Sequence, residues 1–420
     1  MHHGPRTDYF MSRRTRYYFD FDSFWSAPYR PFFLAAFVSA FLTLAWWPLG
    51  VSLGLPAPLL YPNVLWHIHE LIFGFTAAAI GGYLLTALSS WTSRPPPSGA
   101  ILKTLVLVWA LARAATALGM VLPLTIPLIL NAFYFLGLAG LISHQVISAR
   151  AYQKLWFVAV IMTLGCGEAL FLSEAFAGRF INCLYLSKII LICLILLMTS
   201  IGARAIPAFT HNWLIGMDYE GTALREKPLS RIAALFFLST ALAMKVLGYD
   251  VASHVALIVA GLSIFWTMTG WKSVATISNP LLAAQHLAFI WLPIGTLIMG
   301  FIELGLLNFP LADGLHTITI GGISGLVMAI AGRAGSHTEN GSMRAGVWFV
   351  MGVSAIWLTT WLRLIAPLFP AYAANIEVAA AILWCTGWLT FILGFTPALF
   401  GPARRPVLSG RKHQSPEAVD

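Results

Sequence analysis

The stretch LWHIHE, residues 65–70, leads directly into an apolar run that continues to residue 88. Two imidazoles and a carboxylate therefore stand at the edge of a segment that is long and apolar enough to cross a membrane. Ionisable groups are costly in a bilayer, and where they occur they usually line a pathway or bind a ligand. Imidazole is a common protein ligand of haem iron and of copper. This stretch predicts a membrane protein that carries a metal or haem.

The composition predicts the same class of protein. Of the 420 residues, 59% are hydrophobic and only 10% are charged, whereas a soluble domain carries about 25% charged residues. About twelve apolar stretches are each long enough to span a hydrocarbon core of ~30 Å. We therefore predict an all-α membrane bundle of about twelve transmembrane helices in one domain, residues 31–400. A basic and aromatic cytoplasmic segment, residues 1–30, precedes it, and a disordered cytoplasmic tail, residues 401–420, follows it. The predicted spans are 31–53, 64–90, 101–121, 123–143, 155–175, 182–203, 230–248, 252–271, 281–304, 314–332, 344–366 and 372–399.

The net charge of +9 reflects membrane orientation in this interpretation, not an affinity for nucleic acid. With the N-terminus inside, all but five of the 25 lysines and arginines fall on the cytoplasmic side, as the positive-inside rule requires. We therefore expect both termini in the cytoplasm. The first 30 residues lack the apolar core of a cleavable signal peptide, so the first span is expected to direct membrane insertion. The five exceptions are Arg113, Arg179, Lys188, Lys245 and Arg363.

The predicted topology sorts the candidate metal-binding histidines into an outer and an inner level. Residues two apart on a regular helix point about 200° apart, so His67 and His69 cannot both bind one metal, whereas His67 and Glu70 share a face. Three explanations stay open. The helix is irregular here, the two histidines serve different sites, or one binds metal while a hydrogen bond holds the other. The candidate metal ligands are His67, His69 and His316 at the outer level and His286 and His337 at the inner level.

Arginines supply further candidate contacts to a cofactor. Arg30, Arg94 and Arg204 stand at cytoplasmic span ends, where a guanidinium could bind a haem propionate through two hydrogen bonds. Their alternative role is to reach lipid headgroups. Arg113 lies well inside the third span and needs an internal partner, for which Glu168 is a candidate.

The cysteines and glycines restrict the chemistry. No CxxC or CxxCH motif occurs, so any haem would be b-type and bound without a covalent link. The segment GGISG, residues 321–325, predicts a close approach of two helices, and the alternative is that its glycines leave room for a flat macrocycle. The four scattered cysteines are Cys166, Cys183, Cys193 and Cys385.

Several motifs together resemble the NnrS family. They are RPFF (30–33), WHIHE (66–70) with FGF (73–75), WTSRPP (91–96), RAIPAFT (204–210), QHL (285–287), WLP (291–293), LHTIT (315–319) and SHT (336–338). The resemblance covers nearly the whole core of the chain. It implies a twelve-span inner-membrane protein of denitrifying and related bacteria that contains haem and copper. It further implies a role in the response to nitric oxide and in resistance to nitrosative stress, with His67, His69, Glu70, His286, His316 and His337 in the family's motif positions.

Three hypotheses compete to explain these features. The first is a haem- and copper-binding protein that handles nitric oxide, with Glu70 and the three arginines as further cofactor contacts. The alternative is a transporter in which histidines line a path for a metal ion or a small anion. The third, a terminal oxidase or nitric oxide reductase, requires an adjacent His-His pair within the spans, and none occurs there. The expected partners are the lipid bilayer and nitric oxide or another small molecule. The motifs do not indicate whether the protein is an enzyme or what donates electrons to it.

Overall fold

The computed structural model describes residues 21–217, 224–225, 227–336 and 343–400. Within these ranges the elements are helices, and no β-strand is found. Twelve described helices are long and apolar enough to cross a membrane, which confirms the predicted span number. The orientation of the two termini stays a prediction. The spans are Tyr29–Gly50, Asn63–Thr92, Ala100–Val121, Thr125–Ser148, Tyr152–Phe176, Phe180–Gly216, Pro228–Val246, Asp250–Met268, Pro280–Glu303, Leu311–Gly335, Val347–Leu368 and Pro370–Phe400.

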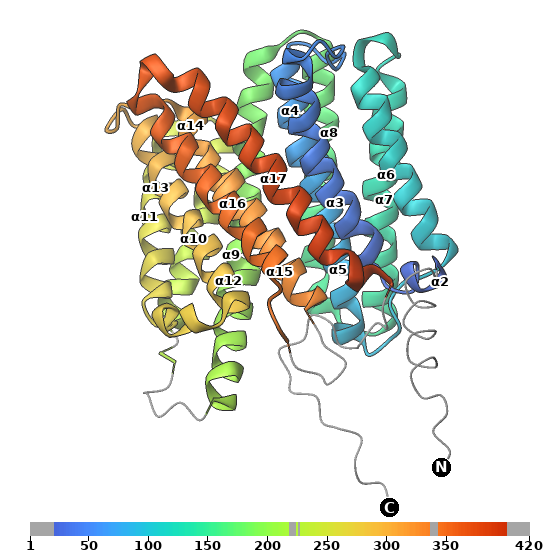
Figure 1. Ribbon diagram of the computed structural model, residues 1–420, viewed down its shortest axis with the longest axis vertical. Coiled ribbons are helices and arrows are strands. Elements are labelled where there is room, and N and C mark those ends of the chain that lie inside the picture. Colours follow the sequence, from blue (N-terminus) through green and yellow to red (C-terminus); the bar gives the residue numbers. More distant parts are fainter. Residues whose placement is uncertain (1–20, 218–223, 226, 337–342, 401–420) are drawn as a thin grey trace, which may run out of the picture. The chain divides into compact units, whose positions relative to one another are not determined.

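The described helices form two compact units, unit 1 before residue 192 and after residue 329, and unit 2 between these positions, residues 192–329. Both boundaries between described parts fall within helices, α9 (Phe180–Gly216) and α15 (Gly325–Gly335) (Figure 1). The other elements of unit 1 are α2 (Phe21–Phe24), α3 (Tyr29–Leu44), η1 (Ala45–Gly50), α4 (Asn63–His69), η2 (Glu70–Phe75), α5 (Thr76–Thr92), α6 (Ala100–Leu118), η3 (Gly119–Val121), α7 (Thr125–Ser148), η4 (Tyr152–Lys154), α8 (Trp156–Phe176), α16 (Val347–Ile365), η7 (Ala366–Leu368), η8 (Pro370–Tyr372) and α17 (Ala373–Phe400). Those of unit 2 are α10 (Pro228–Val246), α11 (Asp250–Met268), η5 (Ser273–Ser278), α12 (Pro280–Phe289), α13 (Trp291–Glu303), α14 (Leu311–His316) and η6 (Thr317–Ser324).

Aromatic side chains and glycines bring α3, α5 and α17 together in unit 1. The ring of Phe37 lies 5.5 Å from that of Trp388 and 5.0 Å from that of Phe391. A Cβ atom at Gly82 would lie 2.9 Å from the Cβ of Phe32, so α3 and α5 can approach this closely only with glycine there. Small residues at such contacts allow the extensive van der Waals packing that holds membrane helices together.

The glycines of η6 have the same use in unit 2. A Cβ at Gly321 would clash with the Trp291 ring, and one at Gly322 would lie 2.7 Å from Leu292 Cδ2. This confirms the close helix approach predicted from GGISG. The helix pair α12–α13 that supplies Trp291 and Leu292 begins at a cap, where the Asn279 side chain accepts a hydrogen bond from the backbone N–H of Leu281 at 3.2 Å.

Helix α9 is longer than the apolar pattern indicates. The predicted sixth span ends at residue 203 because Arg204 and the polar residues after it interrupt the hydrophobic run, and residues 204–227 were expected to be a connection. The structure corrects this: α9 continues unbroken to Gly216 and includes Pro207. Hydrophobicity marks where the bilayer ends, whereas the helix ends where its backbone hydrogen bonding stops.

Two π-helical segments follow the two outer histidine motifs. Helix α4 ends at His69 and η2 begins at Glu70, while α14 ends at His316 and η6 begins at Thr317. In each case a hydroxyl at the end of the segment donates to the carbonyl five residues earlier, Thr76 to Leu71 and Ser324 to Thr319, both at 2.8 Å. π-Helical turns are rare and often occur at functional sites.

Large apolar side chains are exposed along the outer faces of the helices. Ile181 is 72% exposed, Leu229 81% and Phe236 62%. Such exposure is unfavourable in water but is satisfied by lipid, as expected of a multi-pass protein in a bilayer.

Candidate functional site

The WHIHE motif lies at the start of the span Asn63–Thr92, whose most apolar 18-residue stretch is 89% buried, more than in any other described span. His69 is fully buried and Glu70 is 3% exposed. Two further charged residues, Arg113 on α6 and Glu168 on α8, meet them inside unit 1. Three spans therefore contribute charged groups to one buried position.

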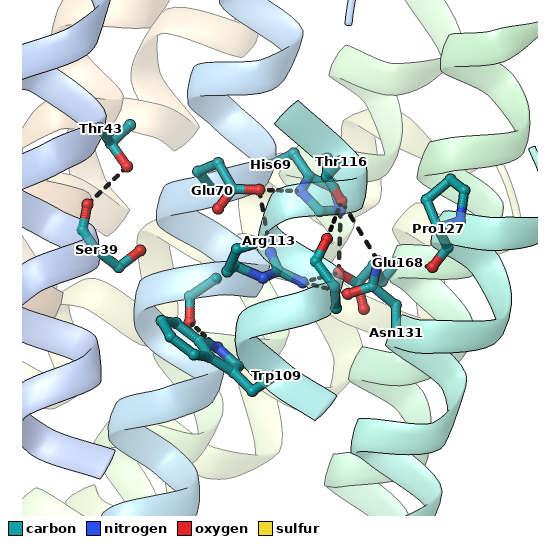
Figure 2. A network of polar contacts seen from close by, with 12 residues as sticks. Ser39, Thr43, His69, Glu70, Trp109, Arg113, Thr116, Pro127, Asn131 and Glu168 are labelled. Carbon is teal, nitrogen blue, oxygen red and sulfur yellow. Dashed lines mark hydrogen bonds and ion pairs between the residues drawn. The ribbon is translucent and has the colours of Figure 1, made fainter. Parts of the chain in front are cut away.

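These four residues, His69, Glu70, Arg113 and Glu168, form an alternating ring of charges, which we call the ionic ring (Figure 2). His69 Nδ1 lies 3.1 Å from Glu70 Oε1, and His69 Nε2 lies 3.0 Å from Glu168 Oε1. The same two oxygens bind the guanidinium, with Arg113 Nη1 3.2 Å from Glu70 Oε1 and Nη2 3.1 Å from Glu168 Oε1. Each carboxylate oxygen is thus shared by the imidazole and the guanidinium, and the predicted Arg113–Glu168 pair is confirmed.

The geometry of the ionic ring defines its charge. Both nitrogens of His69 face carboxylate oxygens, of which the Nδ1 contact with Glu70 has hydrogen-bond geometry and the Nε2 contact with Glu168 is an ionic contact alone. An imidazole can offer an N–H to both oxygens only when it is protonated, so this arrangement favours the imidazolium. With an imidazolium, two carboxylates and one guanidinium, the ring has no net charge. Since an unbalanced charge inside a membrane is costly, the neutral ring is the arrangement that the bilayer favours.

Neighbouring polar groups hold the ionic ring in place. Arg113 Nη2 donates to the side-chain oxygen of Asn131, whose amide nitrogen donates to Pro127 O at 2.9 Å. Trp109 Nε1 donates to Gly74 O within η2 at 3.1 Å. A Cβ at Gly74 would lie 2.9 Å from Glu70 Oε2 and 3.1 Å from Arg113 Cδ. Figure 2 shows Trp109 and Asn131 on either side of the guanidinium. The sequence alone did not indicate Asn131 or Trp109, because neither belongs to a motif.

His67 lies in a different environment from His69. Its ring centre is 5.4 Å from that of Trp47 in η1, and Arg363 on α16 is near enough to act on it electrostatically. The Nδ1 atom of His67 is buried and has no hydrogen-bond partner in the described part of the chain. Among the three explanations for the spacing of the two histidines, the structure favours the one in which they lie in separate environments. His69 is held by polar partners.

His286 is buried in unit 2 between two hydroxyl groups. Its Nε2 and Nδ1 lie 2.9 Å from Thr210 Oγ1 and Ser273 Oγ, respectively. Because the Thr210 hydroxyl donates to Ile206 O at 3.0 Å, it accepts from His286, so Nε2 carries a proton. In its neutral form, His286 therefore presents the lone pair of Nδ1 to the Ser273 hydroxyl.

The remaining candidate residues are not gathered into one cluster. His316 is partly exposed at the end of α14, and His337 lies outside the described residues. Within the described ranges, no group of three or more His, Cys, Asp or Glu side chains is arranged to hold a metal ion. The structure brings His69 and Glu70 together, with Arg113 and Glu168 instead of a second histidine.

The candidate arginines lie far along the chain from the WHIHE motif. Arg30 is fully buried and donates to Ser23 and to Tyr29 Oη, 3.2 Å away. Arg94 donates to Ser148 O at 2.9 Å, and Arg204 is exposed. The helical segments from His67 to residue 92 span about 35 Å at ~1.5 Å per residue. Arg94 therefore cannot contact a group that is bound to His67.

Taken together, the fold and these contacts define a polytopic helical membrane protein with buried histidines and carboxylates. Residues 23–403 match the family model described as NnrS protein, and the chain belongs to the NnrS family. Membership of this family suggests involvement in the response to nitric oxide. No curated protein matched the chain.

Proposed function

We propose that this protein binds haem and copper in the bacterial inner membrane and protects the cell against nitric oxide and nitrosative stress. Family membership supports the biological role. The observation that supports metal binding is the buried Nδ1 of His67, which has no hydrogen-bond partner among the described residues. Buried polar atoms are nearly always paired, and a bound metal would satisfy this one.

The histidines of the motif differ in how well they fit a metal. A ligand nitrogen must present a lone pair, which His67 Nδ1 can do. His69 is a poorer candidate while the ionic ring is intact, because a carboxylate oxygen lies within 3.1 Å of each of its nitrogens, although its Nε2 makes no hydrogen bond within the described residues. His286 could bind through Nδ1 if the metal replaced the Ser273 hydroxyl. We therefore propose His67, His286 and His316 as ligands and His69 and Glu70 as positioning residues; His337 stays a predicted ligand.

The chain's own residues would then have distinct roles. Trp47 covers one side of His67 and limits the access of water. The ionic ring fixes the start of η2, three residues after His67, and so limits the positions that the imidazole can adopt. Arg30 and Arg94 could pair with the propionates of a haem only at the opposite end of the helices. When bound, a ferrous haem or a copper ion with an open coordination position would supply the binding site for nitric oxide.

The test is an optical spectrum and a metal analysis of the purified protein. We expect a Soret band and copper in the parent chain and a clear loss of one of them in His67→Ala. His144→Ala is the matched control, because His144 is exposed near the end of α7 and should not change either content. Full haem and copper in His67→Ala would refute the assignment. A parent protein with neither haem nor copper would instead favour the transporter.

A further inference from the structure

A second cluster of titratable side chains lies in unit 2 and includes none of the predicted metal ligands. It consists of Lys245 from the end of α10, Asp250 and His254 from the start of α11, and Glu303 from the end of α13. We call it the His254 cluster. Lys245 Nζ lies 2.6 Å from Asp250 Oδ1 and 3.5 Å from His254 Nε2. The same Nε2 lies 3.3 Å from Glu303 Oε2.

The His254 cluster extends from the protein surface into the protein. The side chain of Asp250 is 50% exposed, whereas those of Lys245 and His254 are 2% and 5% exposed. The predicted orientation places these helix ends at the outer side of the membrane. Intramembrane lysine, histidine and glutamate are rare and usually take part in ion or proton movement.

One nitrogen of His254 faces a donor and an acceptor at the same time. The Lys245 ammonium can only donate, and a Glu303 carboxylate can only accept. A protonated Nε2 donates to Glu303 and offers nothing to Lys245. An unprotonated Nε2 can accept a hydrogen bond from Lys245. It then has no proton to donate to Glu303, so its contact with Glu303 is favourable only if that carboxyl group is protonated. Both distances are long for hydrogen bonds, so a small shift of either partner would favour one state over the other.

We propose that His254 and Glu303 form a proton-binding site that is loaded from the outer surface past Asp250 and Lys245. On loading, a proton from water forms an O–H bond on Glu303 or an N–H bond on His254 Nε2. Transfer between them breaks the O–H bond on Glu303 and forms the N–H bond on His254 Nε2, or the reverse, without any change of oxidation state. The site is independent of haem or copper, so the failure of the proposed function would not affect it.

The surroundings of the site contain few other charges. Helix α10 contributes Lys245, α11 contributes Asp250 and His254, and α13 contributes Glu303. Helix α14 packs against α13, since a Cβ at Gly314 would lie 3.0 Å from Ile302 Cδ1, and it carries the buried Asp313. If the cluster were a static ion-pair network that only joins the helices, Lys245 and Glu303 would not need to share His254 Nε2.

Infrared difference spectroscopy of the full-length protein in lipid nanodiscs tests the proposal. Acidification should produce the C=O band of a newly protonated carboxyl group with a one-proton profile, and Glu303→Gln should remove this band. Glu174→Gln is the matched control, because Glu174 pairs with Arg179 at 2.5 Å outside the cluster, and it should leave the band in place. Lys245→Met removes a neighbouring positive charge and should shift the midpoint of the band.

Two results would overturn the proposal. The first is a spectrum of Glu303→Gln that equals that of the parent. The second, which applies even if Glu303→Gln does not fold, is a midpoint that is the same in the parent, in Lys245→Met and in His254→Gln. Either result would show that the cluster is a fixed ion-pair network.

Discussion

Replacement of Arg113 by leucine tests the charge balance of the ionic ring. The substitution keeps a side chain of moderate size but leaves two carboxylates with a single imidazolium, so the buried ring gains one net negative charge. Breaking a buried ion pair by removing one partner costs about 3 to 5 kcal/mol. We expect Arg113→Leu to lose stability in this range, because both of its carboxylate partners are at most 4% exposed.

The expected rescue makes the prediction specific. Glu168→Gln alone leaves the ring with one positive charge too many and should also destabilise the protein. The double variant, Arg113→Leu with Glu168→Gln, is neutral again and should be clearly more stable than the sum of the two single losses predicts. Unfolding in mixed micelles with increasing SDS, followed by tryptophan fluorescence, measures these differences.

The same cycle can refute the assigned charge. If His69 were neutral, the native ring would carry one negative charge, and Glu168→Gln would make the protein more stable. A stabilised Glu168→Gln variant, or strictly additive losses in the double variant, would show that the ring is not a balanced set of four charges.

Three other predictions concern the cofactor, the topology and the packing. Haem should be released by acid–acetone, because no CxxCH motif can attach it; haem that stays on the denatured chain would contradict this. Reporters fused after Gly99 and after Pro402 should lie in the cytoplasm and one fused between residues 174 and 180 outside it, and a periplasmic signal at Gly99 would reverse the orientation. Gly321→Ala should destabilise unit 2 by about 1 to 3 kcal/mol through overpacking against Trp291, as SDS unfolding would measure. Gly140→Ala, with open space around the new Cβ, is the control and should cost nothing.

The sequence predicted the architecture because the physics of a bilayer is visible in composition. Apolar length predicted the spans, and the structure contains twelve described helices of that kind. The pairing of Arg113 with Glu168 was also predictable, since a charge within a span needs a partner of opposite sign. The extension of α9 to Gly216 was not, because a helix can continue beyond the apolar run that reveals it.

The details of the site were less predictable. The π-helical turn after His69 depends on backbone hydrogen bonding that residue types do not reveal. The contact of His69 with Glu168 joins residues about a hundred positions apart, and no spacing rule within one helix can predict it. The sequence thus identified the charged members of the ring, but it assigned His69 to a metal, which the ring's geometry does not favour.

The ionic ring and His67 explain why two histidines with different surroundings stand two residues apart. Opposite faces of α4 carry them, so a single helical turn can place one imidazole among carboxylates and leave Nδ1 of the other without a hydrogen-bond partner among the described residues. The ring joins α4 and η2 to α6 and α8 through ion pairs, and it can do so in a membrane because its charges cancel. A helix that is held in this way on one face keeps the histidine on its other face in a fixed position. Fixed ligand geometry is what a metal site requires, and in this interpretation His69 contributes to that site by holding the helix that positions His67.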